Sequence, residues 1–466
     1  MPRVKVGTMA KDKAGKKKLS KGDNKIAAEK GDKGMTRTEP AGRLYKAADL
    51  VDLPDDELLE AVQRQTFRFF WEGAEPASGM ARDRTTRTVD TPNDLVAIGG
   101  TGFGIMAMIV AMERGWISRA EGLERLTRII DVIEPTTCFH GAYSHFMHGE
   151  TGKVWPFSRK DDGGDLVETA FLFQGLLCAR EYFDADSLAE TKLRKRITGL
   201  WGEIEWNWYT QGRHALYWHW SPNNGFVLDH DIHGWNECLI AYVMAVSAPR
   251  YPIDPAAYHR GFVASKDFGA PRSYYDIELP LGPDRGGPLF WAHYSFLGLD
   301  PRGLKDRYAD YWQQNVAHTM INHRHCVLNP HGHKGYGPDC WGLTASDDPD
   351  GYAAHQPSED NGVISPTAAL SSFPYAPREA MAALRHFLAK YGDKVWGRFG
   401  FVDAFSEERD WFADTFLSID QGPIIVMIEN YRTGLIWNLF MRIPEIQAGL
   451  RKLGFESPHL KAEAEA

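Results

Sequence analysis

The sequence predicts an all-α protein, an (α/α)6 barrel in which six helical hairpins form a toroid. Three observations support this fold class. Twelve segments show helical spacing of apolar residues, and no long run alternates as a strand would. Several even-numbered segments are apolar nearly all round, which is typical of helices buried on both sides. Three long loops, 135–162, 210–230 and 323–364, would gather at one end and form a cleft.

The helical segments begin at residue 55 and have recognisable starts. Pro54 precedes the first and Gly73 ends it. Ser118 caps the third, with Glu121 three residues later in a capping-box pattern. The expected helices are Asp55–Glu72, Asn93–Arg114, the helix after Ser118, Gly163–Tyr182, Ser187–Tyr209, Asp231–Ser247, Gly287–Phe296, Lys305–Ile321, Ser365–Ser372, Pro377–Tyr391, Gln421–Leu439 and Ile443–Leu453.

Charge and composition divide the chain into three parts. Residues 1–40 hold ten Lys and two Arg against five acidic residues and have few large apolar residues, which predicts a basic, disordered tail. The whole chain has a net charge of −9, so the remaining 426 residues carry −16. An acidic body argues against nucleic acid as a partner. Residues 41–455 contain no linker and should form one catalytic domain, and 456–466 should be a flexible C-terminal tail.

Membrane and secretion signals are not apparent. No run of 18 apolar residues exists, so no transmembrane helix is expected, and the N-terminus lacks the apolar core of a signal peptide. The five cysteines are widely spaced and odd in number, which favours reduced thiols. These features predict a cytoplasmic protein, or a periplasmic or secreted one if the native N-terminus differs. The oligomeric state is left open.

Three carboxylates are candidates for catalysis. Asp165 and Glu168 stand three residues apart at the start of an apolar helix and project from one face. The alternative is that they only cap the helix N-terminus. Glu237 lies in a run that turns apolar at once, and burial would raise its pKa, as a general acid requires. The alternative for Glu237 is a buried ion pair with an arginine.

Other residues could bind a sugar. Tyr336 and Trp341 offer aromatic faces in a glycine-rich loop, and Asp347 can accept hydrogen bonds from hydroxyl groups; an ordinary loop with a packed Trp is the alternative. Asp420 precedes an apolar helix as a capping acid would, whereas Glu429 lies inside it. The substrate-binding candidates are Trp235, Asn236, Tyr336, Trp341, Asp347, Asp420, Gln421 and Glu429.

No cofactor motif accompanies these residues. Four histidines cluster within eleven residues, but their spacing fits no closed zinc pattern, so no metal is predicted; they are His323, His325, His331 and His333. The glycines of 99–104 follow no strand, which argues against a nucleotide site. Paired carboxylates among aromatic residues, without a cofactor, favour glycoside hydrolysis.

Five runs, in order, resemble a known family. They are GGDLVETAFLFQGLL, HGWNECLI, YGPDCWGLTASD, ISPTAALSSFPYAP and IDQGPIIVMIENYRTGLIW. Together they look like the glucoamylase-like family, which includes the β-1,2-glucanases of glycoside hydrolase family 144, and they resemble the transglycosylase domain of cyclic β-1,2-glucan synthases. The resemblance covers about residues 55–455. It implies one (α/α)6 barrel that hydrolyses β-1,2-glucan, endo-acting or releasing sophorose and short sophoro-oligosaccharides, with inversion.

The resemblance also implies roles for individual residues. Glu237 matches the general acid, and Asp165 and Glu168 match an acidic pair from which we favour Asp165 as the base. The positions expected to line the sugar subsites are Trp341, Asp347, Asp420 and Glu429. The implied partner is a β-glucan or gluco-oligosaccharide. One alternative is a glucan transglycosylase, or a hydrolase of a different or cyclic β-glucan, on the same barrel. A second is a non-catalytic glucan-binding protein, against which the three acids argue.

Overall fold

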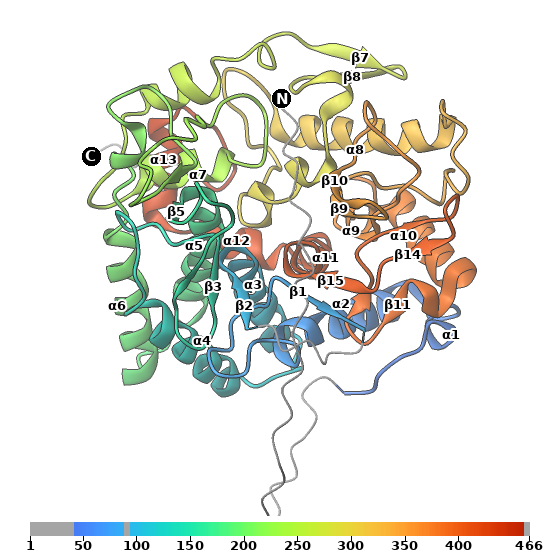
Figure 1. Cartoon of the computed structure of the whole chain (residues 1–466), viewed down its shortest axis with the longest axis horizontal. Helices are drawn as coiled ribbons and strands as arrows, with labels where there is room; N and C mark the ends of the chain where they lie inside the picture. Colours follow the sequence, from blue (N-terminus) through green and yellow to red (C-terminus); the bar gives the residue numbers. More distant parts are fainter. Residues whose placement is uncertain (1–41, 88–93, 461–466) are drawn as a thin grey trace, which may run out of the picture.

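The computed structural model describes residues 42–87 and 94–460 and is mostly helical (Figure 1). The α-helices are α1 (Ala47–Leu50), α2 (Asp55–Trp71), α3 (Ile98–Glu113), α4 (Arg119–Ile133), α5 (Leu166–Tyr182), α6 (Leu188–Gly202), α7 (Leu239–Ser247), α8 (Tyr311–Leu328), α9 (Pro366–Leu370), α10 (Pro377–His386), α11 (Ser418–Arg432), α12 (Leu435–Met441) and α13 (Pro444–Lys452). Short 3-10 turns include Leu289–Ala292 and Ser295–Leu297.

The strands in the described part of the chain are all short, at most four residues. They are β1 (Arg84–Thr86), β2 (Leu95–Ala97), β3 (Phe146–His148), β4 (Val154–Trp155), β5 (Gly164–Asp165), β6 (His219–Trp220), β7 (Arg272–Tyr274), β8 (Ile277–Leu279), β9 (Ala345–Asp348), β10 (Gly351–Ala354), β11 (Trp396–Gly397), β12 (Gly400–Phe401), β13 (Phe405–Ser406), β14 (Trp411–Phe412) and β15 (Thr415–Leu417). They pair antiparallel as β1–β15, β2–β3–β4, β5–β6, β7–β8, β9–β10, β11–β12 and β13–β14.

Helices α3, α5, α7 and α11 are buried nearly all round and form the centre of the molecule (Figure 1). Glycines allow α3 and α5 to pack backbone against backbone. A Cβ added at Gly102 would lie 2.1 Å from the carbonyl oxygen of Phe171, and one at Gly175 would lie 2.1 Å from that of Gly102. No larger side chain fits there, so the glycines that the sequence places in these helices set the helix separation.

Amphipathic helices such as α4 surround this centre. Helix α4 buries one stripe of residues, and its start confirms the predicted capping box, with Ser118 accepting from the Glu121 N–H and the Glu121 side chain returning to the Ser118 backbone. One hydrophobic core extends from Ala47 to Phe455.

Three central helices are each entered through a short strand. Strand β2 leads into α3, β5 into α5 and β15 into α11. The predicted starts of the helices at Asn93 and Gly163 were therefore too early, because 95–97 and 164–165 are extended. The helix starts also lie side by side: the Gly99 N–H donates to Glu168, and a Cβ at Gly100 would meet Ser418 Oγ at 2.1 Å. The N-terminal ends of α3, α5 and α11 thus share one end of the molecule.

Other predicted boundaries were also wrong. Helix α7 begins at Leu239, eight residues after the predicted start, because Gly234 has a φ of 80° and residues 231–238 run as loop and turn. Helix α6 ends at Gly202 rather than Tyr209. The predicted helix Gln421–Leu439 is two helices, α11 and α12, separated at Gly434, whose φ is 73°.

The predicted tails are only partly within the described residues. Residues 1–40 and 461–466 lie outside them. Residues 456–460 pack against the body: Glu456 pairs with Lys305, and His459 Nε2 lies 2.9 Å from Asp300 Oδ2. These five residues are therefore held against the body of the protein. The five cysteines are free, as predicted, and among the described residues no helix is both long and apolar enough for a bilayer.

The α3–α5 contact makes a prediction about stability. Gly102→Ala should lower the free energy of unfolding by about 1–3 kcal/mol, because its Cβ would collide with the α5 backbone. Gly199→Ala is the matched control: this glycine is exposed on α6, with nothing within 4 Å of an added Cβ. That variant should gain about 0.5–1 kcal/mol from helix propensity. Urea unfolding measures both, and equal stabilities would contradict the close contact.

Candidate active site

Asp165 is the N-cap of α5 and its carboxylate is fully engaged. Oδ1 accepts from the backbone N–H groups of Val167 (3.0 Å) and Glu168 (2.9 Å). Oδ2 lies 2.9 Å from His145 Nδ1 and accepts from Trp218 Nε1 at 3.2 Å. The capping role is therefore real, but Asp165 also fixes the orientation of an imidazole.

Glu168 stands one turn further along the same face of α5. Its Oε2 accepts from the Gly99 N–H at 2.8 Å, and its Oε1 lies 4.0 Å from His145 Nε2. Burial raises the pKa of Glu168 to about 7, although the neighbouring His145 cation opposes the shift. Oε1 is thus the less engaged oxygen of this acidic pair.

His145 lies between the two acids. Burial alone would lower its pKa, but the charges of Glu168 and Asp165 outweigh that effect and raise it to about 10. The imidazole is therefore a cation at neutral pH and holds the two carboxylates together. Sequence analysis missed His145, because a histidine in a long loop carries no local signal of its tertiary partners. The half-exposed ring of Phe157 lies 4.8 Å from it and offers an apolar face beside the acids.

Glu237 occupies the turn immediately before α7. The Ser295 hydroxyl donates to the Glu237 carbonyl and accepts from the Ile240 N–H at 3.0 Å, which anchors this turn to a neighbouring segment. Burial raises the pKa of the Glu237 carboxyl to about 7, and repulsion from Glu168 and Asp165 adds to the shift. Among the described residues no cation offsets it, so the predicted alternative of an arginine partner is wrong.

A second acidic group forms around β9 and the start of α11. Asp347 Oδ1 lies 2.9 Å from Arg84 Nη1, and the Asp347 N–H donates to Asp403 Oδ2 at 2.6 Å. Burial and the charge of Asp347 raise the pKa of Asp403 to about 7. Burial raises the pKa of Asp420 well above its usual range, and the negative charge of Asp403 adds to this effect. Asp420 Oδ2 has no hydrogen-bond partner among the described residues.

The two acidic groups face a common residue. Burial raises the pKa of Tyr294, and the charges of Asp420 and Glu237 add to this effect, so Tyr294 lies within electrostatic reach of both groups. Asp420 is inside the first turn of α11, whose N-cap is Leu417, so the prediction that Asp420 caps this helix is wrong. Sequence analysis missed Asp403, which no helix or motif distinguishes.

Several predicted sugar contacts are packing residues instead. Trp235 is 1% exposed and packs on Phe296 and Tyr311; Trp341 is 0% exposed and donates to the Glu379 carbonyl at 3.2 Å. Neither ring has a free face, so both predictions of stacking surfaces are wrong.

The remaining loop and helix candidates have modest local roles. Gln421 is buried and donates to the Phe401 carbonyl at 2.8 Å. Asn236 is partly exposed and its Oδ1 accepts from the Cys238 N–H at 2.9 Å, next to Glu237. Tyr336 is partly exposed and donates to the Val363 carbonyl at 3.2 Å.

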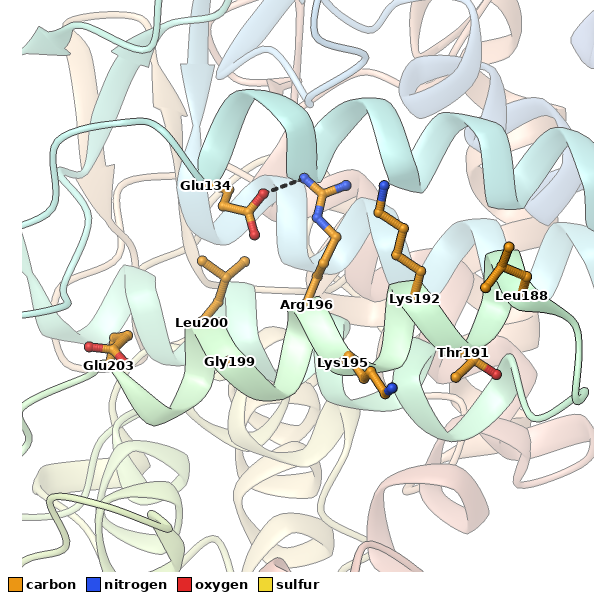
Figure 2. A pocket seen from close by; sticks show the side chains of 9 residues that line it. All are labelled: Glu134, Leu188, Thr191, Lys192, Lys195, Arg196, Gly199, Leu200 and Glu203. Carbon is orange, nitrogen blue, oxygen red and sulfur yellow. Dashed lines mark hydrogen bonds and ion pairs between the residues drawn. The ribbon is translucent and has the colours of Figure 1, made fainter.

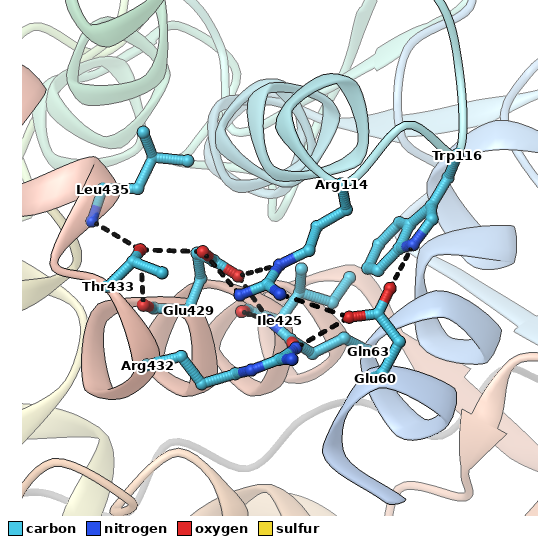
Figure 3. Close-up of polar contacts among 9 residues, drawn as sticks. All are labelled: Glu60, Gln63, Arg114, Trp116, Ile425, Glu429, Arg432, Thr433 and Leu435. Carbon is cyan, nitrogen blue, oxygen red and sulfur yellow. Dashed lines mark hydrogen bonds and ion pairs between the residues drawn. The ribbon is translucent and has the colours of Figure 1, made fainter. Parts of the chain in front are cut away.

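Glu429 belongs to an ion-pair network at the other end of α11 (Figure 3). Arg114 binds it with two nitrogens, at 2.9 and 3.0 Å, and Thr433 donates to it at 2.8 Å. Glu429 follows Asp420 by nine positions in α11, which is about 13.5 Å along the helix axis. The prediction that Glu429 lines a sugar subsite is therefore wrong.

A groove of about 720 Å³ lies between α4 and α6 (Figure 2). Its lining is mixed in charge, with Lys192, Lys195 and Arg196 beside Glu134 and Glu203, and Arg196 pairs with Glu134 at 2.7 Å. None of the predicted site residues lines it.

Comparisons with known proteins identify the family of this chain. A family model described as putative glucoamylase matches residues 229–444. The exo β-1,2-glucooligosaccharide sophorohydrolase (non-reducing end) of Parabacteroides distasonis is 45% identical over 429 residues, which are 87% of this chain. The chain spans 59% of the length of that relative.

This chain aligns with the full length of two solved structures. A putative glucoamylase from Bacteroides uniformis is 54% identical, with a TM-score of 0.86 over 88% of this chain. An endo-β-1,2-glucanase from Chitinophaga pinensis, solved with sophorotriose and glucose, is 51% identical, with a TM-score of 0.85 over 88% of this chain. On this likeness over most of its length, the chain belongs to the glucoamylase-like family.

Proposed function

We propose that the protein is a glycoside hydrolase that cleaves β-1,2-glucan with inversion, either internally or by releasing sophorose and short sophoro-oligosaccharides. One observation carries the proposal: Glu237, with a pKa raised to about 7, lies within electrostatic reach of Glu168 and Asp165. This arrangement supplies a protonated acid and further carboxylates at one site. The likeness to an endo-β-1,2-glucanase and to an exo-acting sophorohydrolase supports the choice of substrate.

We further propose that the helices close as an (α/α)6 toroid. Outer and inner helices alternate along the chain as α2–α3, α4–α5, α6–α7, α8–α9 and α10–α11. Neighbouring inner helices touch in the order α9, α11, α3, α5 and α7. The 3-10 turn Ser295–Leu297 contacts α7, and the turn before it is joined to the segment after α9, where the Tyr375 hydroxyl donates to the Ala292 carbonyl at 3.0 Å. These two turns would fill the sixth inner position, between α7 and α9.

Glu237 is the proposed general acid. Its carboxyl proton passes to the glycosidic oxygen as the bond from that oxygen to the anomeric carbon breaks. A water molecule attacks the anomeric carbon from the opposite face, and one of its protons passes to a carboxylate. The raised pKa keeps Glu237 protonated up to about neutral pH, as this step requires.

Glu168 is the proposed base, in place of Asp165, which the sequence favoured. Both Asp165 oxygens already have two partners each, whereas Glu168 Oε1 has only His145 at 4.0 Å. The water's proton can pass to Oε1 directly or through a second water or a substrate hydroxyl. Asp165 then acts as a positioning residue that orients His145.

Replacing the acid should abolish turnover without unfolding the protein. Glu237→Gln keeps the size of the side chain but has no proton to donate, so kcat on linear β-1,2-glucan should fall by about 10²–10⁴-fold. Glu278→Gln, an exposed residue on β8, is the control and should remain fully active. Reducing-end release measures the activity, and circular dichroism checks the fold. Full activity in Glu237→Gln would refute its assignment, and longer or cyclic products from the wild type would indicate transfer.

The pH profile should report the acid form of Glu237. Because the protonated form is active and its pKa is about 7, kcat/KM on β-1,2-glucan should decline as the pH rises through about 7. An aryl sophoroside with a nitrophenol leaving group needs no proton, so its hydrolysis should not show that alkaline decline. The same decline for both substrates would assign it to another group.

Chemical rescue should separate the two base candidates. Glu168→Ala should lose turnover, and added azide, which attacks without losing a proton, should restore cleavage and yield the α-glycosyl azide. Asp165→Asn should also be impaired, because His145 loses the carboxylate that orients its ring, but azide should not rescue it. Rescue of the Asp165 variant alone would reverse the assignment. A β-configured azide would contradict inversion.

A further inference from the structure

Four side chains that catalysis does not use form a compact cluster far along the sequence from the catalytic acids. The His–Asp cluster comprises His325, His331, His333 and Asp360. His325 is in the last turn of α8, His331 and His333 are in the loop that follows, and Asp360 lies beyond β10. His325 Nε2 is 3.0 Å from Asp360 Oδ2, His331 Nδ1 is 2.6 Å from Oδ1, and His333 Nε2 is 3.5 Å from Oδ2.

These separations match those between ligands of one metal ion. The ligand atoms of His325, His331 and Asp360 all lie within 4.8 Å of one another. Zinc bound tetrahedrally at about 2.1 Å requires ligand atoms about 3.4 Å apart, so side-chain adjustments of about 1 Å would bring these atoms to the required separations. His333 Nε2 is buried and has no hydrogen-bond partner among the described residues, which leaves it as a third nitrogen, and a fourth ligand, for the ion.

Hydrogen-bonding neighbours orient the imidazole rings, as is usual for histidines that bind a metal. The Tyr275 hydroxyl is 2.8 Å from His325 Nδ1, and Glu408 Oε2 is 2.9 Å from His333 Nδ1. Such partners fix the tautomer and direct the opposite nitrogen toward a metal. The Asn329 side chain accepts from the His333 N–H and donates to its carbonyl, both at 2.8 Å, which fixes the loop that carries two of the histidines.

We propose that the His–Asp cluster binds one divalent zinc-class ion through three imidazole nitrogens and one carboxylate oxygen. Imidazole ligands favour zinc over magnesium or calcium. The His325 and Asp360 side chains are each 1% exposed, so the site is shielded, while His331 is 55% exposed and leaves a route for the ion. Sequence spacing alone argued against zinc, because the fourth ligand comes from a distant loop.

The ion would have a structural role next to the reaction site. It would join the end of α8 to the loop that follows β10. The next residue, Asn361, donates to Asp348 Oδ2 at 2.6 Å, and Asp348 ends the strand that carries Asp347. A cation in the His–Asp cluster would therefore hold β9 in place against Arg84.

Metal titration of the full-length, untagged protein tests the proposal. After chelation and dialysis, calorimetric titration with ZnCl₂ should give one ion per chain, and Co²⁺ should give the visible absorption of a tetrahedral site. His331→Ala and His333→Ala should each weaken Zn²⁺ binding at least about 100-fold, and Glu408→Gln should weaken it about 10–100-fold. His331 is exposed, so its variant should fold normally.

His323→Ala is the matched control. His323 is on the same helix as His325. Because the two are only two residues apart, their side chains point to different sides of the helix. The Nε2 atom of His323 is 3.0 Å from the Pro338 carbonyl oxygen. Zn²⁺ should raise the melting temperature of the wild type and of His323→Ala, but not of His331→Ala. Failure to bind one ion per chain, or equal binding by the wild type and by folded His331→Ala, would overturn the proposal and leave a hydrogen-bonded cluster only.

Discussion

The close contact between α3 and α5 is the constraint on which the site depends. Gly102 and Gly175 bring the two backbones together, and this separation places the first turn of α3 beside the first turn of α5. The Gly99 N–H can then donate to Glu168, and the Gly100 position leaves room for Ser418 at the start of α11. A wider spacing would leave the Glu168 carboxylate without this donor. Helix packing thus determines the chemistry at the helix ends.

Few positively charged side chains lie near the acids at the N-terminal ends of α5 and α11. The N-terminal ends of α5 and α11 stabilise nearby negative charge, which favours Glu168 and Asp420 in their first turns. His145 and Arg84 supply formal positive charge to the two acidic groups. Burial outweighs this positive charge and raises the pKa values of Glu168, Glu237 and Asp403 to about 7, and repulsion between neighbouring carboxylates adds to the shift. Acids that exchange protons near neutral pH are the result.

The sequence correctly predicted features that depend on residues nearby in the chain. Predictions failed where contacts with residues distant in the chain determine the structure. The capping box at Ser118 is local and was correct. The raised pKa of Glu237 followed from the apolar run after it and was also correct. By contrast, the sequence around an acid in a buried helix does not show which end of the helix faces the site. Glu429 was therefore assigned to the wrong end of the molecule. The burial of Trp341 and the role of His145 depend on residues far away in the chain, and no pattern in one sequence contains that information.

The acidic residues at the two ends of α11 differ in how they are paired. At its start, Asp420 has an oxygen without a partner among the described residues, an arrangement that costs folding free energy. At its far end, Glu429 is held by the guanidinium fork of Arg114. Removing one partner of such a buried pair typically costs about 3–5 kcal/mol. The two ends are joined by one rigid rod but share no hydrogen bond. Adaptation to a new substrate can therefore alter residues at the first end while the second continues to secure the scaffold.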